Sequence, residues 1–370
     1  MSHTAPLSAH TVADPRAPAF REAWRAIEAQ AHRVPAPEAL VAVATPKAGL
    51  RIAAATENGQ LVGVWPFRIT RAGPLKLAVR PGGPVQVYDG PTIRADAREA
   101  TITQALWAVV KGWSDVDLVM LPAFLPDTPL HTLVDIGGVL IPKARTARIR
   151  LATLDSAEAL VARQPKHRRK SIRRRGRALA KRGDVAFSTP TDPAERADCV
   201  AWALDTKVAW LDDQDALGMT VRSPAFRKML DDLARKPAGL IVHQLTVGDE
   251  LAAVELGFCD GRSYHSYLGT FHPDFAKEGA GVALTLEVVG WAIAQGLSDY
   301  DLLAPLTDFK ATWSDHQRVV SSAMVPMGVR GHLAAPLFRD TRDRLKQLGG
   351  KLPAGVREPV LTAFEWVRPK

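Results

Sequence analysis

Four side chains in the second half of the chain have the chemistry to move a proton: Glu255, His265, Tyr267 and Asp301. Tyr264 stands beside them as a further candidate. Histidine titrates near neutral pH, and a carboxylate in an apolar strand is unfavourable unless it is paired or solvated. Side chains of this kind favour general acid–base catalysis, in which a base contributes about a hundredfold to ten-thousandfold in rate.

Each candidate also has a purely structural interpretation. His265 fits a histidine hydrogen-bonded within a sheet equally well. Glu255 lies between the apolar residues Val254 and Leu256 on one strand. Because an unpaired carboxylate is unfavourable in the core, we expect the Glu255 side chain to face a groove. Asp301 follows a strand, where ligand sites gather in α/β proteins, but Asp117 repeats it in the first half, so a shared structural role stays open.

The elements that position these residues run from residue 239 to residue 315. The strands 240–247, 251–259 and 263–271 are joined by the two-residue turns Gly248-Asp249 and Asp260-Gly261, which predicts an antiparallel meander. A helix over residues 282–295 ends at Gly296 and is followed by a strand over residues 298–304. A crossover helix of this kind delivers a parallel strand.

Turn geometry makes a definite prediction about the two strongest candidates for the base. A two-residue turn at Asp260-Gly261 pairs Cys259 with Arg262 and, further out, Glu255 with Ser266. His265 is then the neighbour of the residue opposite Glu255. Because neighbouring residues on one strand point to opposite faces, only one of the two side chains can reach a reacting atom unless a β-bulge intervenes. We favour Glu255.

A glycine-containing loop precedes the helix at 282–295. A helix N-terminus binds phosphate through its backbone N–H groups. The candidate phosphate-binding residues are Lys277, Gly279, Ala280, Gly281 and Lys310. Plain turn glycines and a solvated lysine are the alternatives.

The two halves of the chain repeat each other. WAVVKGWSDVDL, residues 107–118, aligns without gaps on WAIAQGLSDYDL, residues 291–302, with seven identities in twelve positions. The identities include Gly-x-Ser-Asp-x-Asp, which two unrelated amphipathic helices would not share. We infer a tandem duplication and expect Trp107 and Trp291 at equivalent positions.

Composition indicates a globular chain of 370 residues, with 46% hydrophobic and 24% charged residues, which suits two domains. Two cysteines sixty residues apart, Cys199 and Cys259, exclude a disulfide framework and a cysteine metal cluster, so we expect no metal. We find no signal peptide and no apolar stretch long enough to span a membrane, and we expect a cytoplasmic protein, with peripheral attachment to the inner membrane left open.

The net charge of +9 comes from one segment, because residues 166–182 carry ten basic residues and no acidic one. Like charges at this density repel one another unless a polyanion offsets them. We expect a helix there whose polyanion-binding residues are Arg168, Arg169, Arg173, Arg174 and Arg175. An anionic lipid head, a nucleotide sugar or a regulatory nucleotide would fit, and a simply solvated helix is the alternative.

The phrases LVGVWPF (61–67), VYDGP (87–91), RRKSIRRRGRAL (168–179) and DYDL with DFKATW (299–313) resemble the CelD-like (BioF-like) branch of the GNAT acetyltransferases, which is related to the Fem aminoacyltransferases. The resemblance implies an α/β fold of tandem GNAT-like (acyl-CoA N-acyltransferase) lobes, with mixed sheets flanked by helices. One departure is the loop 276–281, where the family's Gln/Arg position is Ala276.

The resemblance implies an enzyme, an N-acetyltransferase that uses acetyl-CoA as co-substrate. Its acceptor would be an amino sugar of an exopolysaccharide or of its precursor. The alternatives are Fem-like transfer from aminoacyl-tRNA, in which tRNA would be the only nucleic acid bound, and a non-catalytic regulator that binds a nucleotide or a membrane. The sequence does not specify the acceptor or the oligomeric state.

We expect an N-terminal lobe at residues 18–150, a basic helical connector at 151–184, a catalytic lobe at 185–332 and a tail at 333–370. Residues 1–17 are expected to be disordered. A pair of strands within residues 318–329 is expected to close the second sheet, and the tail is expected to contain one amphipathic helix around Leu337 and Leu345.

Overall fold

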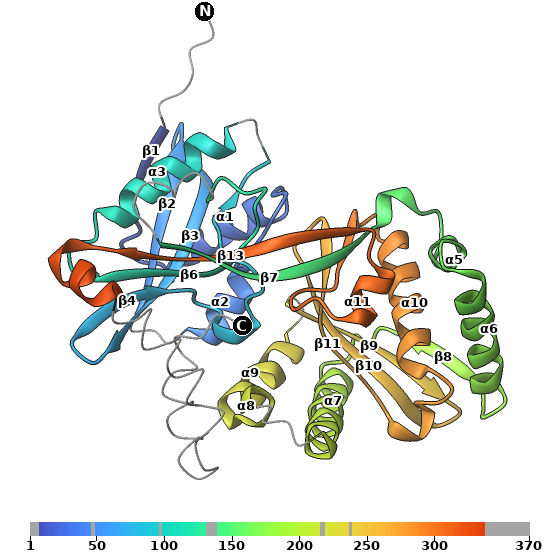
Figure 1. Ribbon diagram of the computed structural model, residues 1–370. Coiled ribbons are helices and arrows are strands. Elements are labelled where there is room, and N and C mark those ends of the chain that lie inside the picture. The colour runs from blue at the N-terminus through green and yellow to red at the C-terminus, as the bar shows by residue number, and fades with distance from the viewer. Residues whose placement is uncertain are drawn as a thin grey trace, which may run out of the picture. The chain divides into compact units, whose positions relative to one another are not determined.

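The computed structural model describes residues 7–45, 49–95, 98–130, 139–214, 219–236 and 239–336. The chain divides into two compact units, which Figure 1 shows with their elements labelled. Unit 1 comprises Met1–Arg145 and Arg318–Lys370, and unit 2 comprises Thr146–Gln317. The tail helix expected around Leu337 lies outside the described residues.

Unit 2 is built on the meander that the sequence predicts. Its helices and strands are α5 (Ala157–Ala162), α6 (Lys166–Ala180), β8 (Val185–Ser188), α7 (Pro193–Asp213), α8 (Met219–Arg222), α9 (Pro224–Ala234), β9 (Leu240–Val247), β10 (Glu250–Cys259), β11 (Ser263–Phe271), α10 (Ala280–Ala294), β12 (Asp299–Asp301) and α11 (Asp308–Trp313). Strands β8 to β11 are antiparallel in sequence order. Strand β12 is parallel to β11, as a crossover through α10 requires.

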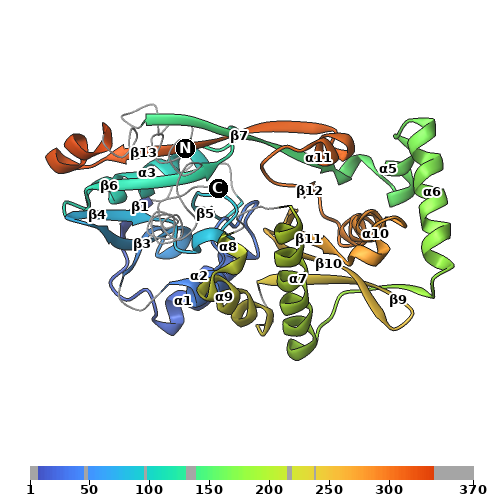
Figure 2. The same cartoon turned by 60° about the horizontal axis from the view of Figure 1, so that its bottom comes forward.

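Helices cover both faces of the unit 2 sheet (Figure 2). His243 of β9 packs its ring against Trp291 of α10. The next residue, Gln244, accepts a hydrogen bond from Cys199 of α7. Because neighbouring residues on a strand point to opposite faces, α10 covers one face and α7 the other. The α10 face forms a continuous apolar core that includes Tyr264 and Tyr300.

Unit 1 repeats this order of elements. The elements of unit 1 are β1 (Leu7–Thr11), α1 (Pro18–Glu28), α2 (Glu38–Ala44), β2 (Leu50–Glu57), β3 (Gln60–Ala72), β4 (Leu75–Val79), β5 (Thr92–Ile93), α3 (Glu99–Lys111) and β6 (Leu118–Phe124). Two further strands, β7 (Val139–Arg150) and β13 (His316–Pro326), each belong partly to unit 1 and partly to unit 2. Strands β2, β3 and β4 form an antiparallel meander, and β6 is parallel to β4 after the crossover helix α3. Trp107 lies in α3 and Trp291 in α10, the corresponding helices.

The repeat extends to a local irregularity. The hairpin β2–β3 begins at the pair Glu57–Gln60, and its register shifts between Leu61 and Gly63. The hairpin β9–β10 begins at Val247–Glu250, and its register shifts between Leu251 and Ala253. The bulged residue is thus the third residue of the second strand in both units. A bulge at one register position in both hairpins supports a duplicated unit, since bulges are specific features of a sheet.

The closing strands correct two expectations. The chain forms one strand, β13, where a pair was expected within residues 318–329, and this strand pairs with β6 of unit 1. The strand that closes unit 2 is β7, antiparallel to β12 through Asp299–Arg150 and Asp301–Arg148. Each unit therefore receives its closing strand from the other half of the sequence. Residues 7–11, expected to be disordered, form β1 on the edge of the unit 1 sheet.

Candidate active site

Strands β11 and β12 separate at the centre of unit 2. Their pairing covers only Ser263–Asp299, Tyr264–Tyr300 and His265–Asp301, whereas β11 continues to Phe271. The carboxyl-terminal part of β11 is thus left without β12 beside it. A strand edge of this kind has free backbone N–H and C=O groups, which can bind an extended ligand.

Glu255 lies on β10 next to this separation. Its strand partner is Gly269 of β11, which is exposed. A Cβ atom at position 269 would stand 3.9 Å from Oε2 of Glu255. The absence of a side chain at Gly269 therefore leaves the carboxyl group close to solvent, although Glu255 itself is only 4% exposed.

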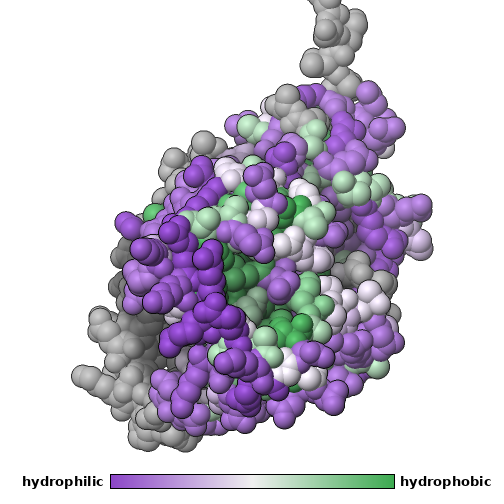
Figure 3. All heavy atoms as spheres, turned by 90° about the vertical axis from the view of Figure 1, so that its right-hand side faces the viewer, coloured by the Kyte–Doolittle hydropathy of each residue, from purple (hydrophilic) through white to green (hydrophobic). Residues whose placement is uncertain are grey.

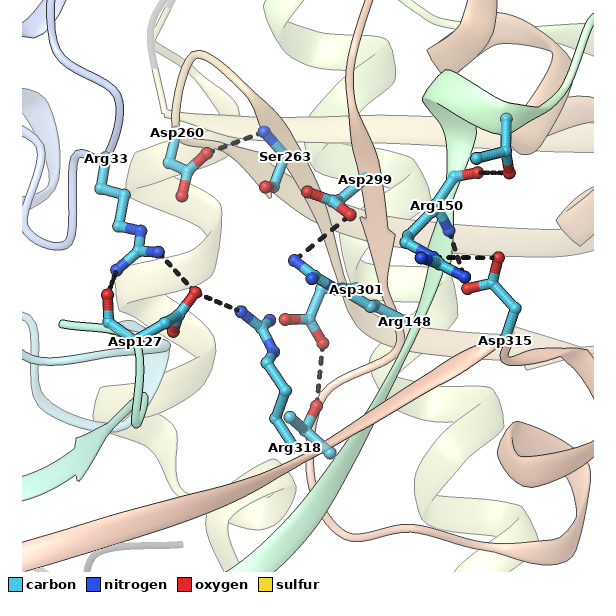
Figure 4. A network of polar contacts seen from close by, with 12 residues as sticks. Arg33, Asp127, Arg148, Arg150, Asp260, Ser263, Asp299, Asp301, Asp315 and Arg318 are labelled. Atoms are coloured by element: carbon cyan, nitrogen blue, oxygen red, sulfur yellow. Dashed lines mark hydrogen bonds and ion pairs between the residues drawn. The ribbon is translucent and has the colours of Figure 1, made fainter. Parts of the chain in front are cut away.

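Two irregularities produce this register, and both correct the sequence analysis. The β10–β11 turn is shifted by one residue from the predicted one, because Cys259 pairs with Tyr264 and the backbone N–H of Asp260 donates to the carbonyl of Ser263. The side chain of Asp260 also closes this turn by accepting a hydrogen bond from the backbone N–H of Ser263 at 2.8 Å (Figure 4). A bulge between Leu256 and Gly257 then moves the partner of Glu255 to Gly269, where Ser266 was expected.

Burial and three hydroxyl groups define the environment of the Glu255 carboxyl. The hydroxyl of Tyr300 donates a hydrogen bond to Oε1 at 2.6 Å. Burial raises the pKa of Glu255 from 4.5 to about 7, and the hydroxyls of Tyr300, Ser266 and Tyr264 offset part of that rise. A carboxyl group that titrates near neutrality can accept a proton at physiological pH and release it again, as a general base must.

Gly257 makes room for this arrangement. A Cβ atom at position 257 would lie 2.2 Å from the ring and hydroxyl of Tyr264, so the ring rests directly on the backbone of β10. Burial, and next the charge of Glu255, raise the pKa values of Tyr264 and Tyr300 well above the ordinary value. Both phenols therefore stay protonated, and Tyr300 donates its hydroxyl hydrogen to Glu255.

His265 lies on the opposite face of the sheet from Glu255, even though the β10–β11 pairing contains the β-bulge that the prediction had excluded. Its neighbour Tyr264 points into the α10 face with Glu255, so His265 points away from it. The Nε2 atom of His265 lies 3.0 Å from Oδ2 of Asp260. Burial raises the pKa of Asp260, but the charge of His265 and the hydrogen bonds to the carboxylate outweigh it and lower the pKa. This contact holds the β10–β11 loop in place.

Tyr267 and Asp301 contact residues of other elements. The ring of Tyr267 packs edge-on against that of Phe258, with 5.5 Å between the ring centroids, and it also packs against Phe226 of α9. Asp301 is buried and accepts hydrogen bonds from the hydroxyl of Thr146 and the backbone N–H of Leu303, both at 2.9 Å. These bonds tie β12 to β7 and favour the structural interpretation of Asp301.

The repeated Asp residues have corresponding structural roles in the two units. Asp299 pairs with Arg148 of β7 at 3.4 Å (Figure 4), and Asp115 pairs with Arg51 and Lys76. Asp117, the equivalent of Asp301, accepts a hydrogen bond from the backbone N–H of Lys76 at 2.7 Å. The repeated motif thus positions a parallel strand.

The predicted phosphate loop forms the N-terminus of α10. Gly279 is the N-cap, with φ +76°, a left-handed conformation that favours glycine, and it contributes no side-chain cap. The N–H groups of Ala280 and Gly281, the first two residues of the helix, have no acceptor within it. A Cβ atom at Gly281 would stand 2.9 Å from Phe271, the last residue of β11. The glycines thus bring α10 against the open end of β11.

The two lysines proposed for phosphate binding differ in environment. Lys277 is exposed on the loop. Lys310, on α11, donates a hydrogen bond from Nζ to the carbonyl of Leu303 at 3.0 Å. Burial lowers the pKa of Lys310, and the charge of Asp301 opposes that effect. Lys310 thus holds the segment that follows β12.

The basic segment forms the helix α6, as predicted. Its inner side packs on α10 through Ile172 and Leu179. Arg173, Arg174 and Arg175 are exposed, whereas Arg168 and Arg169 are half-buried and donate to Gln164 and to the carbonyl of Ala162. On the face of unit 2 that carries α5, α6 and α10, a broad band of hydrophilic side chains borders a recessed apolar area (Figure 3).

Sequence reasoning missed Tyr300, Gly257 and His243. Tyr300 replaces Val116 within the repeated motif, a difference that could have marked it. Gly257 interrupts an apolar strand, which is a signal of a bulge or a close approach. His243 is the strand partner of Glu255 on the other side and is fully buried, and burial lowers its pKa to about 3, so it is neutral. No sequence pattern singled it out.

Within the described residues, no helix has the length and apolar character needed to cross a bilayer. A search of curated protein sequences found no significant match. Residues 166–311 match the acetyltransferase (GNAT) domain family.

Solved structures share the fold of the whole chain. FemX has a TM-score of 0.61 at 11% identity, with 82% of this chain and 95% of FemX covered. L-PGS from Bacillus licheniformis has a TM-score of 0.55 at 14% identity, covering 90% and 97% of the two chains. The C-terminal domain of a putative lysylphosphatidylglycerol synthetase from Agrobacterium fabrum has 0.52 at 14%, covering 85% and 94%. The resemblance to Fem-related GNAT proteins that was stated from the sequence therefore holds at the level of the fold: residues 166–311 match the acetyltransferase (GNAT) domain family, and the chain as a whole shares the fold of FemX.

Proposed function

We propose that unit 2 transfers an acetyl group from acetyl-CoA to an amine, with Glu255 as the general base. One observation carries the proposal: a carboxyl group with a pKa of about 7 lies beside the separation of β11 and β12, next to an exposed glycine. In a GNAT domain this is the position at which a base and a thioester can meet. The pyrophosphate of the donor binds at the first turn of α10.

The reaction needs few groups. The amine nitrogen attacks the thioester carbon, the C–S bond breaks, and Glu255 takes the proton that the nitrogen loses. The departing thiolate is a moderate base, with a thiol pKa of about 8.5, and takes a proton from solvent. Tyr300 donates to the Glu255 carboxyl and holds it in place. A positioned base of this kind contributes about a hundredfold to ten-thousandfold.

The acceptor in this proposal is an amino sugar of an exopolysaccharide or of its precursor. The support is the resemblance of the second half to the CelD-like branch. The exposed Gly269 gives an acceptor amine a route to Glu255 that avoids the buried core. Acetyl transfer from acetyl-CoA to glucosamine and to short glucosamine oligomers, measured by thiol release, tests this acceptor class.

A second function is aminoacyl transfer from a charged tRNA. The fold shared with FemX, together with the exposed arginines of α6, favours it. Calorimetry with acetyl-CoA and, separately, with aminoacyl-tRNA distinguishes the two. Binding of acetyl-CoA alone supports acetyl transfer, and binding of charged tRNA alone supports aminoacyl transfer. Binding of neither would leave a regulator without transferase activity, and would refute both enzyme functions.

A further inference from the structure

Helix α6 carries arginines that the protein itself does not neutralise. Arg173, Arg174, Arg175 and Arg177 form no ion pair with any residue in the described ranges. Six arginines elsewhere in unit 2 form ion pairs: Arg148, Arg150, Arg163, Arg222, Arg227 and Arg235. Repulsion between like charges three and four residues apart disfavours an isolated helix of this composition. The unpaired charges therefore point to an anionic ligand from outside the chain.

Arg175 differs from the other exposed arginines in where it lies. A Cβ atom at Gly279 would stand 3.2 Å from Cδ of Arg175 and 3.8 Å from its Nη1. Its guanidinium group thus lies against the N-cap of α10. At about 100° per residue, Arg175 is about 40° from Leu179 around the helix, whereas Arg177 is about 160° from it and points to solvent.

Arg182, the last residue of the basic segment, already shows how this segment holds the loop. Its Nη1 donates to the carbonyl of Asp274 at 3.3 Å and lies 3.6 Å from Glu278, and its guanidinium stacks on Phe275. The charge of Arg182 is therefore engaged by the loop itself. Arg175 lies about two helical turns before Arg182 in the chain. It has no such acceptor among the described residues.

We propose that Arg175 binds the phosphate groups of the acyl donor, and so supplies from α6 the cation that the loop lacks at Ala276. This inference rests on the proposed use of an acyl-CoA donor. The guanidinium of arginine binds phosphate oxygens through two parallel hydrogen bonds, which a single backbone N–H cannot do. The first-turn N–H groups of α10 and the Arg175 side chain then contact the same pyrophosphate. The outer arginines contribute only a general positive potential.

The test uses two substitutions of equal charge on one helix. Arg175→Gln should weaken acetyl-CoA binding about tenfold by calorimetry, and flatten its dependence on salt concentration. Arg177→Gln removes the same charge from the outer face and should leave the Kd within about twofold. S-acetyl-pantetheine, which has the thioester and no phosphate, should be turned over equally by wild type and Arg175→Gln.

Four results would overturn the inference. Equal acetyl-CoA affinity in wild type and Arg175→Gln would show that Arg175 is not a ligand, while the proposed acetyl transfer would stand. An equal loss of acetyl-CoA affinity in Arg175→Gln and Arg177→Gln would indicate a general electrostatic attraction and not a direct contact with Arg175. Unchanged acetyl-CoA binding with loss of binding to phosphatidylglycerol vesicles would assign the surface to lipid. Failure of the wild type to bind acetyl-CoA at all would refute the proposed function, and this inference with it.

Discussion

Replacement of Glu255 by glutamine tests both the chemistry and the energetics of the site. Glutamine has the shape of a protonated glutamate, so its carbonyl oxygen can still accept the hydrogen bond that Tyr300 donates at 2.6 Å. The variant therefore removes the ability to take a proton while leaving the packing of β10 and β12 in place. If Glu255 is the base, acetyl transfer should fall by about a hundredfold or more.

The same substitution has a calculable effect on stability. The folded protein holds the Glu255 proton up to a pKa of about 7, whereas the unfolded chain releases it near 4.5. Between these values the folded state binds more protons, so stability decreases as pH rises. At about 1.4 kcal/mol for each pH unit, ionised Glu255 destabilises the fold by about 3 kcal/mol above pH 7. Glu255→Gln avoids this penalty.

Two measurements follow. Thermal unfolding of both proteins from pH 4 to pH 9 should show little difference at the acid end, and a growing advantage for Glu255→Gln toward pH 8. The pH profile of kcat/KM should rise through about 7 in the wild type, because the carboxylate form is the active one, and should lose that limb in the variant. Calorimetry with acetyl-CoA controls for donor binding, which should not change.

Two outcomes would contradict the proposed role of Glu255, one in activity and one in stability. Full activity in Glu255→Gln would exclude the carboxylate as base, whatever the melting curves show. A wild type that becomes more stable with rising pH, relative to the variant, would mean that Glu255 is ionised and stabilised in the fold. The pKa would then lie below 4.5, and a different group would have to account for any limb near neutrality.

Three further predictions concern the surroundings of Glu255. Gly269→Val should lower kcat/KM for the amine at least tenfold with little change in melting temperature, because the valine side chain would cover the route to Oε2 of Glu255 without entering the core. An unchanged kcat/KM would place the route of the amine elsewhere. Gly257→Ala should destabilise unit 2 by about 1 to 3 kcal/mol, since its Cβ would overlap the ring of Tyr264, and wild-type stability in denaturant titration would contradict the packing. His265→Gln should lower stability by about 1 kcal/mol through loss of the Asp260 pair but keep the pH limb near 7; disappearance of that limb would move the role of base to His265.

The sequence was sufficient for the elements because their signals are local. Asn58 and Gly59 adopt positive φ values of 52° and 75° at the β2–β3 hairpin, and an Asn-Gly dipeptide is a strong local signal for such a turn. Gly296, with φ +70°, follows the end of α10 where a helix stop was expected. The basic segment became one helix, because its apolar residues Ile172 and Leu179 recur at helical spacing and pack on α10. Each of these features depends on residues a few positions apart.

Two features could not be predicted: the register of β10 against β11, and the closing of each unit by a strand from the other half of the sequence. Both depend on contacts between residues far apart in the sequence. The Asp260 loop and the bulge beside Gly257 together move the partner of Glu255 from Ser266 to Gly269. Glu255 and His265 nevertheless lie on opposite faces, because Tyr264 turns inward with Glu255. Likewise, nothing local to residues 318–326 indicates that this strand pairs with β6, more than 190 residues earlier. Tertiary pairing decides such features.

Comparison of the two units shows why the proposed chemistry fits unit 2 and not unit 1. The shared bulge aligns β3 with β10 residue by residue, which places Trp65 at the position of Glu255, and Ala53 at that of its partner His243. Trp65 is buried against Trp107, the equivalent of Trp291. An indole cannot accept a proton from an amine, and it fills the space that the carboxyl and tyrosine hydroxyls occupy in unit 2.

The helix starts differ in the same sense. Helix α10 begins with Gly279 and has no acidic residue in its first turn, whereas α3 begins with Arg98 as N-cap and has Glu99 in its first turn. A carboxylate at a helix N-terminus occupies the positive end of the helix dipole and repels phosphate. Unit 1 thus retains the strand-positioning residues Asp115 and Asp117 but has neither a base nor an anion site at these two positions. The packing motif is present in both halves, whereas the residues proposed for acid–base catalysis and phosphate binding are found in unit 2.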